Sequence, residues 1–377
     1  MSLALGRVTC TTYTCPDGAK ADAAAQQAAI LDVLAGAFTP IAPGSQVECS
    51  AGCCGFADPF AAPVAVILPD GATIFGFRID TLKIPSSYLK AAVADAVKKR
   101  CAALGRAKLA KREVDLLKAE VKQELRAQSL PRMLHLQVVV DAGMSAIRVF
   151  TASPAALTIL CDLWEKATGW QLRDTGDTRQ AVDYLASIKA DKYPDADRLH
   201  LDGMPSFGDF APPSLGSEFL TWLWWRRERD DGTVGDCSIE FMKSLALERF
   251  AGLMTEKCTV SSEAEPTEEE ARTALRMGKQ VAKARLCLST AENVFEVAVA
   301  ADLSLSSIKL PQVAPPDDDT GEAAGEQAAL LVDRLALLRE CESAIAGLFG
   351  LFLVIRCDPA AWGAERKLLH KWIVEGA

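Results

Sequence analysis

One segment of this 377-residue chain carries side chains that could neutralise phosphate groups. Between residues 98 and 132 there are eleven Lys and Arg residues and four Asp and Glu residues, a local balance of +7 in a chain whose formal charge is −9. Cations at this density can follow a phosphate backbone and release its counterions. The same pattern fits a solvated helix surface with ion pairs four residues apart, so the charges alone favour neither interpretation. The basic residues are Lys98, Lys99, Arg100, Arg106, Lys108, Lys111, Arg112, Lys118, Lys122, Arg126 and Arg132.

The cysteines and histidines indicate little catalytic or metal chemistry. Zinc ligands usually come as paired Cys knuckles at matched distances, but here only Cys49 and Cys53 have a suitable spacing, and the spacing of Cys10 and Cys15 is loose. The chain has only three histidines and lacks phosphate-binding glycine motifs and a nucleophile elbow. We therefore expect ordinary thiols, no metal, no cofactor and no enzyme activity. A Cys-dependent or metal-dependent enzyme remains a third alternative, which would need bound zinc or a thiol of depressed pKa.

Four large aromatic residues follow one another closely at 219–225 and could stack on nucleic-acid bases. Aromatic side chains at helical spacing more often fill a core or a subunit interface, and we favour that interpretation. The residues are Phe219, Trp222, Trp224 and Trp225.

The basic segment falls on a predicted pair of helices. Apolar residues recur every three or four positions from Val93 to Leu104, Gly105 interrupts the pattern, and it resumes at Val114 and ends before Pro131. Strand-like hairpins are predicted on either side, at 64–79 around Asp70-Gly71 and at 134–150 around Gly143. The pattern predicts an antiparallel helix pair that projects from a sheet.

The rest of the chain mixes helices with antiparallel strands. Helices are predicted at 21–36, from Ser153-Pro154 to Gly169, at 219–229 after a Ser217 cap, at 271–277 after a capping box of Thr267 and Glu270, at 327–348, and from Asp358-Pro359 onward. Strands are predicted near 237–247, 281–289, 293–300 and 304–310, and the apolar run 344–355 is interpreted as a buried helix end and strand. Residues 170–216 look irregular with one short helix near 179–190, and 311–326 looks like a solvated linker.

These elements predict an α+β fold, because no regular strand–helix–strand alternation occurs. The expected organisation is a central α+β domain made of 1–83 and 134–175, an inserted helical arm at 84–133, an irregular insertion at 176–216, and a second α+β domain with a C-terminal extension at 217–377. No secretory signal opens the chain, and the apolar run 344–355 is short of the roughly 20 residues that a membrane helix needs. We expect a cytoplasmic protein with reduced thiols and no membrane contact.

The order of several short motifs resembles the RdgC family of recombination-associated proteins over most of the chain. The collinear order of the motifs carries the resemblance, and each motif alone is unspecific. The motifs are Ala37-Phe38-Thr39-Pro40, Gly44-Ser45-Gln46, Lys83-Ile84-Pro85-Ser86, Lys118-Ala119-Glu120-Val121, Ser129-Leu130-Pro131-Arg132, Val140-Asp141, Phe219-Leu220-Thr221-Trp222 and the run from Ala274 to Val281.

The resemblance implies a non-enzymatic, ring-shaped homodimer that encircles double-stranded DNA without sequence preference, restrains RecA filaments and is associated with the nucleoid. It implies that 98–132 belongs to an arm whose tip meets its dimer mate and DNA, and that Lys279 faces the hole. The predicted DNA-binding residues are Lys98, Lys99, Arg100, Lys108, Lys111, Arg112, Arg132 and Lys279.

The sequence departs from the family pattern at two places. Leu134 stands where an aromatic residue is usual, and Glu263-Ala264 replaces an expected Lys-Gln pair. These departures, with the acidic net charge, favour the alternative: a dimeric scaffold of the same fold that binds proteins and has lost its DNA affinity.

Overall fold

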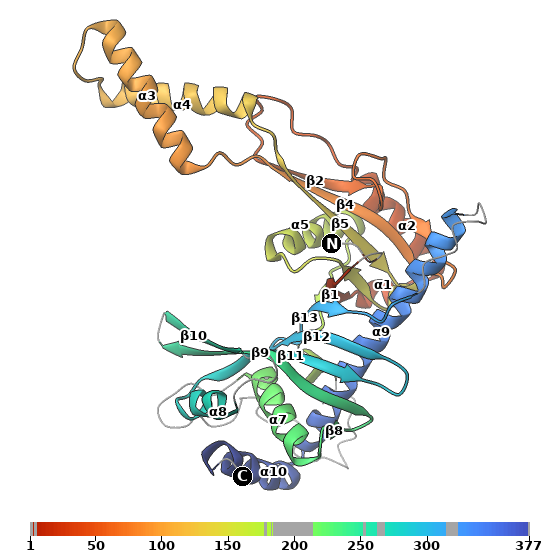
Figure 1. Cartoon of the computed structure of the whole chain (residues 1–377). Coiled ribbons are helices and arrows are strands. Elements are labelled where there is room, and N and C mark those ends of the chain that lie inside the picture. Colours follow the sequence, from red (N-terminus) through yellow and green to blue (C-terminus); the bar gives the residue numbers. More distant parts are fainter. Residues whose placement is uncertain are drawn as a thin grey trace.

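The computed structural model describes residues 3, 6–176, 179–181, 183, 214–251, 254–261, 268–313 and 323–375. Its described strands form one 13-stranded sheet, in which each paired strand runs antiparallel to its neighbour. Helices pack against both ends of this sheet, which confirms the α+β class (Figure 1). The main path along the sheet is β10-β9-β11-β12-β13-β1-β6-β5-β4-β2.

Two half-sheets meet at the first strand, β1 (Val8–Thr14). The first half-sheet consists of β2 (Cys49–Cys54), β4 (Thr73–Thr81), β5 (Arg132–Val140) and β6 (Ile147–Val149), with short β3 (Val66–Ile67) and β7 (Arg173–Asp174) beside it. The second half-sheet consists of β8 (Thr233–Val234), β9 (Cys237–Ala251), β10 (Met254–Ser261), β11 (Gln280–Ser289), β12 (Val294–Ala300) and β13 (Leu305–Lys309). The strands β1, β2 and β10 were not among our sequence predictions.

Helices α2 (Ala23–Ala35) and α5 (Pro154–Thr168) cover the first half-sheet, and short α1 (Pro16–Lys20) precedes them. Asp22 caps α2, and α5 begins with Pro154 and ends at Gly169 with a left-handed φ of 72°, as its sequence predicts. Val33, Leu160 and Trp164 from these helices are buried in one core with side chains of β4 and β5. The turn between β5 and β6 contains the short 3-10 helix η1 (Ala142–Met144).

Helix α7 (Leu215–Arg229) lies in the core of the second half. It begins earlier than predicted, because the side chain of Ser214, and not that of Ser217, accepts the capping hydrogen bond, from the Ser217 N–H. Trp222 and Phe219 are fully buried, and Trp224 and Trp225 are almost so, which confirms that the aromatic cluster is a core feature.

Helix α9 (Ala323–Arg356) corrects two predictions: the linker ends before residue 323, and 344–355 contains no strand. Ile345, Leu348, Phe349 and Phe352 are buried at helical spacing against α7, and an unbroken apolar run cannot by itself distinguish a buried helix from a strand. Helix α10 (Pro359–Glu375) follows as predicted. No single helix in the described ranges is long and apolar enough to cross a membrane, although α9 and α10, bent by 105°, pass that test as a pair.

The predicted helix pair is present as α3 (Ser86–Leu104) and α4 (Lys111–Gln128), which project from the first half-sheet (Figure 1). Gly105 ends α3 with a φ of 63°, the conformation that glycine adopts most readily. Helix α8 (Glu268–Arg276) begins before the predicted residue 271. Thr267, Glu263-Ala264, most of 176–216 and the middle of the 311–326 linker lie outside the described residues. Of the short helix predicted near 179–190, residues 179–181 and 183 are described, and they are helical.

Candidate nucleic-acid interface

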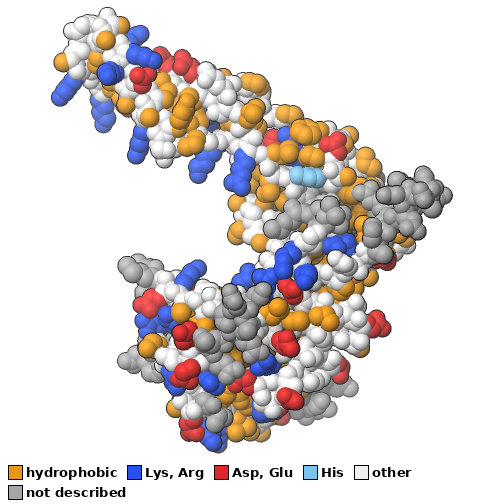
Figure 2. Space-filling view, viewed as in Figure 1, with side chains coloured by type: hydrophobic (Ala, Val, Ile, Leu, Met, Phe, Trp, Pro, Cys, Tyr) orange, Lys and Arg blue, Asp and Glu red, His pale blue; other side chains and the backbone are white. Residues whose placement is uncertain are grey.

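The molecule has a hollow on one side, between the helix pair and the second half-sheet (Figure 2). In the space-filling view, Lys and Arg side chains follow the side of the helix pair that faces this hollow (Figure 2). Further Lys and Arg side chains gather at the back of the hollow, in the region of β1 and β13 (Figure 2). The hollow therefore has cationic side chains on two of its walls.

Seven of the eight predicted site residues lie on or beside the helix pair, and all seven are exposed. They occupy the last turns of α3, the loop to α4, the first turn of α4 and the first position of β5. Lys99 pairs with Asp95, one turn earlier, at 2.8 Å, but both side chains remain mostly exposed, so water or a phosphate can replace this contact. The seven residues are Lys98, Lys99, Arg100, Lys108, Lys111, Arg112 and Arg132.

Arg126 belongs to the same charged segment, but it has a structural role. Its side chain is only 4% exposed and donates to Gln46 at 2.7 Å and to Glu48 at 2.5 Å. Lys122, one turn earlier, also contacts Glu48 at 3.3 Å. The contacts of Arg126 fasten the base of α4 to the segment that precedes β2, and they take this buried cation out of the candidate interface. The Lys122 side chain is 44% exposed, so, like Lys99, it can exchange its carboxylate for a phosphate.

Lys279 lies apart from the other predicted residues. It follows Gly278, whose φ is 78°, and is half-buried in the turn between α8 and β11. These two elements lie in the half of the molecule away from the helix pair (Figure 1). The structure does not bring Lys279 together with the helix-pair cations.

A second group of cations, which the sequence analysis missed, lies on the open face of the second half-sheet. Glu296 of β12 pairs with Arg7 and Lys309 at 2.8 Å each and with Arg285 at 3.8 Å. Lys283 of β11 donates to Ser306 at 2.7 Å. We call Glu296 and the four cations Arg7, Lys283, Arg285 and Lys309 the sheet cluster. Three of these cations contact the one carboxylate and Lys283 contacts a hydroxyl, so the sheet cluster keeps an excess positive charge.

Hydrogen bonds from Lys309 and Arg7 lower the pKa of the Glu296 carboxyl to about 2. This carboxylate thus stays ionised at all ordinary pH values and holds the cations in place. The alternation of Lys283 and Arg285 along β11 was the only sequence signal for the sheet cluster. Lys309 reaches Glu296 from the neighbouring strand, 13 residues along the chain, whereas Arg7 reaches it from 289 residues away because β1 pairs with β13.

The thiols do not form a reactive site. Burial raises the pKa of Cys53 to about 12 and that of Cys54 to about 11, the opposite of the shift that activates a thiol. Among the residues that the structure describes, His, Cys, Asp and Glu side chains do not gather as a metal-binding group. A cavity of about 430 Å³ beside β1 and α9 is lined by Asp174, Asp302 and Glu342, which disfavour an anionic ligand.

Comparison with known proteins adds no family assignment, because no family model and no curated protein matches the chain.

Proposed function

We propose that this protein binds double-stranded DNA without sequence preference, with its hollow as the binding surface. The observation that carries the proposal is the presence of Lys and Arg side chains on two walls of one hollow, along the helix pair and in the region of β1 and β13 (Figure 2). Arg7, directly before β1, and Lys309, at the end of β13, belong to the sheet cluster. Lys and Arg would contact phosphates and release counterions, a mode of binding that needs no base contacts.

We further propose that two chains form a ring. The hollow of one chain is open on one side, between the tip of the helix pair and the hairpin of β9 and β10, so a second copy related by a twofold axis could close it (Figure 1). The resemblance to the RdgC family supports this arrangement. It also suggests that the ring lies on nucleoid DNA in the cytoplasm and competes there with RecA.

The acidic charge of the rest of the chain is consistent with a protein that binds DNA only through its hollow. With a net charge of −9, the outer surfaces would repel DNA, and the cations of the hollow would select the orientation in which DNA approaches.

The test is the fluorescence anisotropy of a labelled mixed-sequence duplex, titrated with protein between about 50 and 200 mM salt. We expect binding that weakens steeply with salt and is equal for a scrambled duplex. The triple variant Lys98→Glu, Lys99→Glu, Arg100→Glu should weaken binding to both duplexes alike and reduce the slope of log affinity against log salt by up to about 3.

A matched control makes the same change of charge on α10, away from the hollow. Arg366→Glu, Lys367→Glu and Lys371→Glu also replace three exposed cations, and binding should change little. An equal loss in both triple variants would assign the effect to total charge, and unchanged binding in the first would remove the helix pair from the interface.

A protein-binding scaffold is the second candidate. Leu116 and Leu130 on and beside the helix pair are exposed large apolar residues, which suit a protein contact better than a phosphate contact. The absence of duplex binding even at low salt would make this candidate the leading one.

A further inference from the structure

The two half-sheets are joined by a strand that changes partner midway. In β1, Val8 and Cys10 pair with β13 of the second half-sheet, whereas Thr11, Thr12 and Tyr13 pair with β6 of the first. One short strand thus carries the hydrogen-bonded connection between the halves. The strand pairing at this joint does not by itself fix the angle between the two halves. Contacts outside the strand pairing must fix it.

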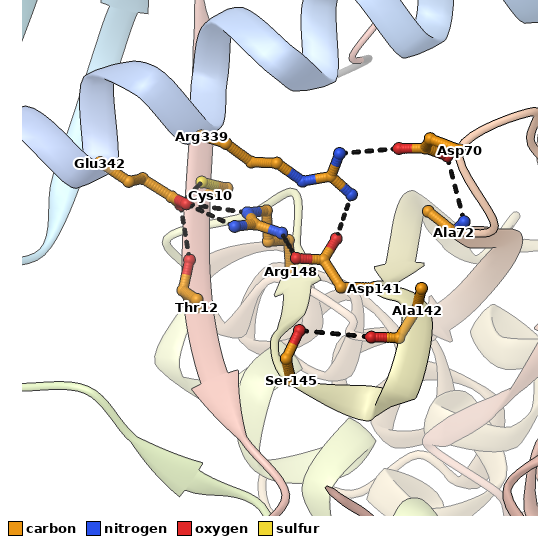
Figure 3. Close-up of polar contacts among 10 residues, drawn as sticks. All are labelled: Cys10, Thr12, Asp70, Ala72, Asp141, Ala142, Ser145, Arg148, Arg339 and Glu342. Carbon is orange, nitrogen blue, oxygen red and sulfur yellow. Dashed lines mark hydrogen bonds and ion pairs between the residues drawn. The ribbon is translucent and has the colours of Figure 1, made fainter. Parts of the chain in front are cut away.

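A chain of ion pairs lies beside this joint (Figure 3). Arg339 of α9 contacts Asp70, in the turn before β4, at 2.7 Å and Asp141, after β5, at 2.5 Å. Arg148 of β6 contacts the same Asp141 at 2.6 Å and Glu342 of α9 at 2.7 Å. Each guanidinium therefore holds two separate segments, and Asp141 is shared between them.

The last member of the chain of ion pairs spans the point where β1 changes partner. Glu342 accepts hydrogen bonds from Thr12 at 2.8 Å and from Cys10 at 3.7 Å (Figure 3). Thr12 pairs with the first half-sheet and Cys10 with the second. One carboxylate on α9 thus touches both sides of the joint.

Helix α9 is also held by the second half-sheet. Glu340, next to Arg339, accepts hydrogen bonds from Thr290 at 2.6 Å and from Asn293 at 2.7 Å, in the turn between β11 and β12. Leu338, Cys341 and Ile345 are buried in a core that holds residues of the second half-sheet and also Ile74 of β4 and Val139 of β5. The helix therefore packs across both halves, and Arg339 and Glu342 add contacts of defined geometry with the first half.

The charged groups of this chain are mostly withdrawn from water. Arg148 is 6% exposed and Asp141 is 12% exposed, whereas Arg339 and Asp70 lie nearer the surface at 31% and 21%. Buried ion pairs are weak evidence for net stability, since desolvation offsets much of their attraction, but the guanidinium fork demands a defined geometry. A set of this kind is suited to fixing an orientation.

We propose that Arg339 and Glu342 are positioning residues that fix the angle between the two half-sheets, and with it the width of the hollow. The claim about the angle stands on the structure alone. Its consequence for DNA affinity rests on the proposed function, because only a hollow of the correct width places both cationic walls against one duplex.

The test measures a distance in the protein without DNA. Spin labels are attached through azide-bearing residues introduced at Ala103, near the tip of the helix pair, and at Lys367 on α10, and an excess of unlabelled chain removes signals between copies. In Arg339→Gln and Glu342→Gln we expect the mean distance to shift by more than about 2 Å, or its distribution to broaden by a comparable amount. Arg339→Lys, which keeps the positive charge, should restore the parent distribution in part.

The matched control is Arg356→Gln. Arg356 is also on α9 and pairs with Glu218 at 2.9 Å, but both groups lie in the second half, so this variant should lower the melting temperature without changing the distance. If Glu342→Gln fails to fold, Asp70→Asn removes only the outermost pair and can still keep the hydrogen bond from the Ala72 N–H. An unchanged distribution in folded Arg339→Gln and Asp70→Asn would overturn the proposal.

Duplex affinity is measured separately on the same variants. A changed distance with unchanged affinity would support the positioning role of Arg339 and Glu342 and count against the hollow as the DNA site. An unchanged distance would reject that positioning role whatever the affinity.

Discussion

At the scale of single residues, the cations of this protein differ in whether their charge is accessible to a ligand. Arg126 is buried and holds the base of α4, so its positive charge is used within the fold. Lys98 and Arg100 are exposed on α3 and can meet a ligand. Glu296 lowers the net positive charge of the sheet cluster, because its carboxylate pairs with three of the cations.

Removing that carboxylate should therefore strengthen binding to DNA. In Glu296→Gln, Arg7 and Lys309 lose their anionic partner, so the sheet cluster gains one net positive charge. We expect a higher duplex affinity in the salt titration and a salt slope steeper by up to about 0.9. Asp32→Asn on the exposed side of α2 makes the same change in net charge elsewhere and serves as the control. Equal gains in both variants would contradict a local role for the sheet cluster.

At the scale of elements, the helix pair is an insertion that the sheet does not need. Thr81 at the end of β4 lies opposite Arg132 at the start of β5, so the two strands would form a hairpin without the helices. In α3, all of which the structure describes, no residue is buried, and α4 buries only Val121 and Arg126. Little core packing is lost if the pair is removed.

We accordingly predict that replacing residues 84–131 with an Asn-Gly turn leaves a folded protein. Leu82, Lys83, Asn and Gly then form a four-residue loop between the paired Thr81 and Arg132, which is a common hairpin length. Circular dichroism should show cooperative melting near the parent temperature, while duplex affinity falls further than in the triple variant at residues 98–100. A variant that melts without cooperativity would show that the pair supports the sheet, and one that binds DNA normally would move the interface to the second half-sheet alone.

At the scale of the whole molecule, the shape of one chain leaves the hollow open on one side (Figure 1). A closed ring needs contacts at both ends of the opening, so the oligomeric state and the function are linked. The exposed apolar residues Leu104 and Leu116 on the helix pair could contribute to such a contact.

Sedimentation should find a species of twice the 40.4 kDa chain mass at micromolar concentration. The chain that lacks 84–131 should dissociate at higher concentration than the parent, because it has lost one of the two proposed contacts. A parent chain that sediments as a monomer at all concentrations would contradict the ring, although an open hollow could still bind DNA.

The sequence by itself determined the elements whose signals are local. Helix periodicity and its interruption at Gly105 predicted the helix pair, and Pro154 and Gly169 marked the ends of α5. The alternation within 281–289 predicted β11. These predictions succeeded because each depends on residues within a few turns or one strand of each other.

Other features were decided only by tertiary packing. The run 344–355 forms a helix because α7 offers it an aromatic surface, and a solid apolar run does not specify its own period. The strand β1 joins the two half-sheets by pairing with β13, almost 300 residues away. This pairing brings Arg7 to Glu296 and Lys309, which lie 13 residues apart in neighbouring strands. Strand register across the sheet brings these groups together, and neither composition nor spacing along the chain encodes that register in a readable form.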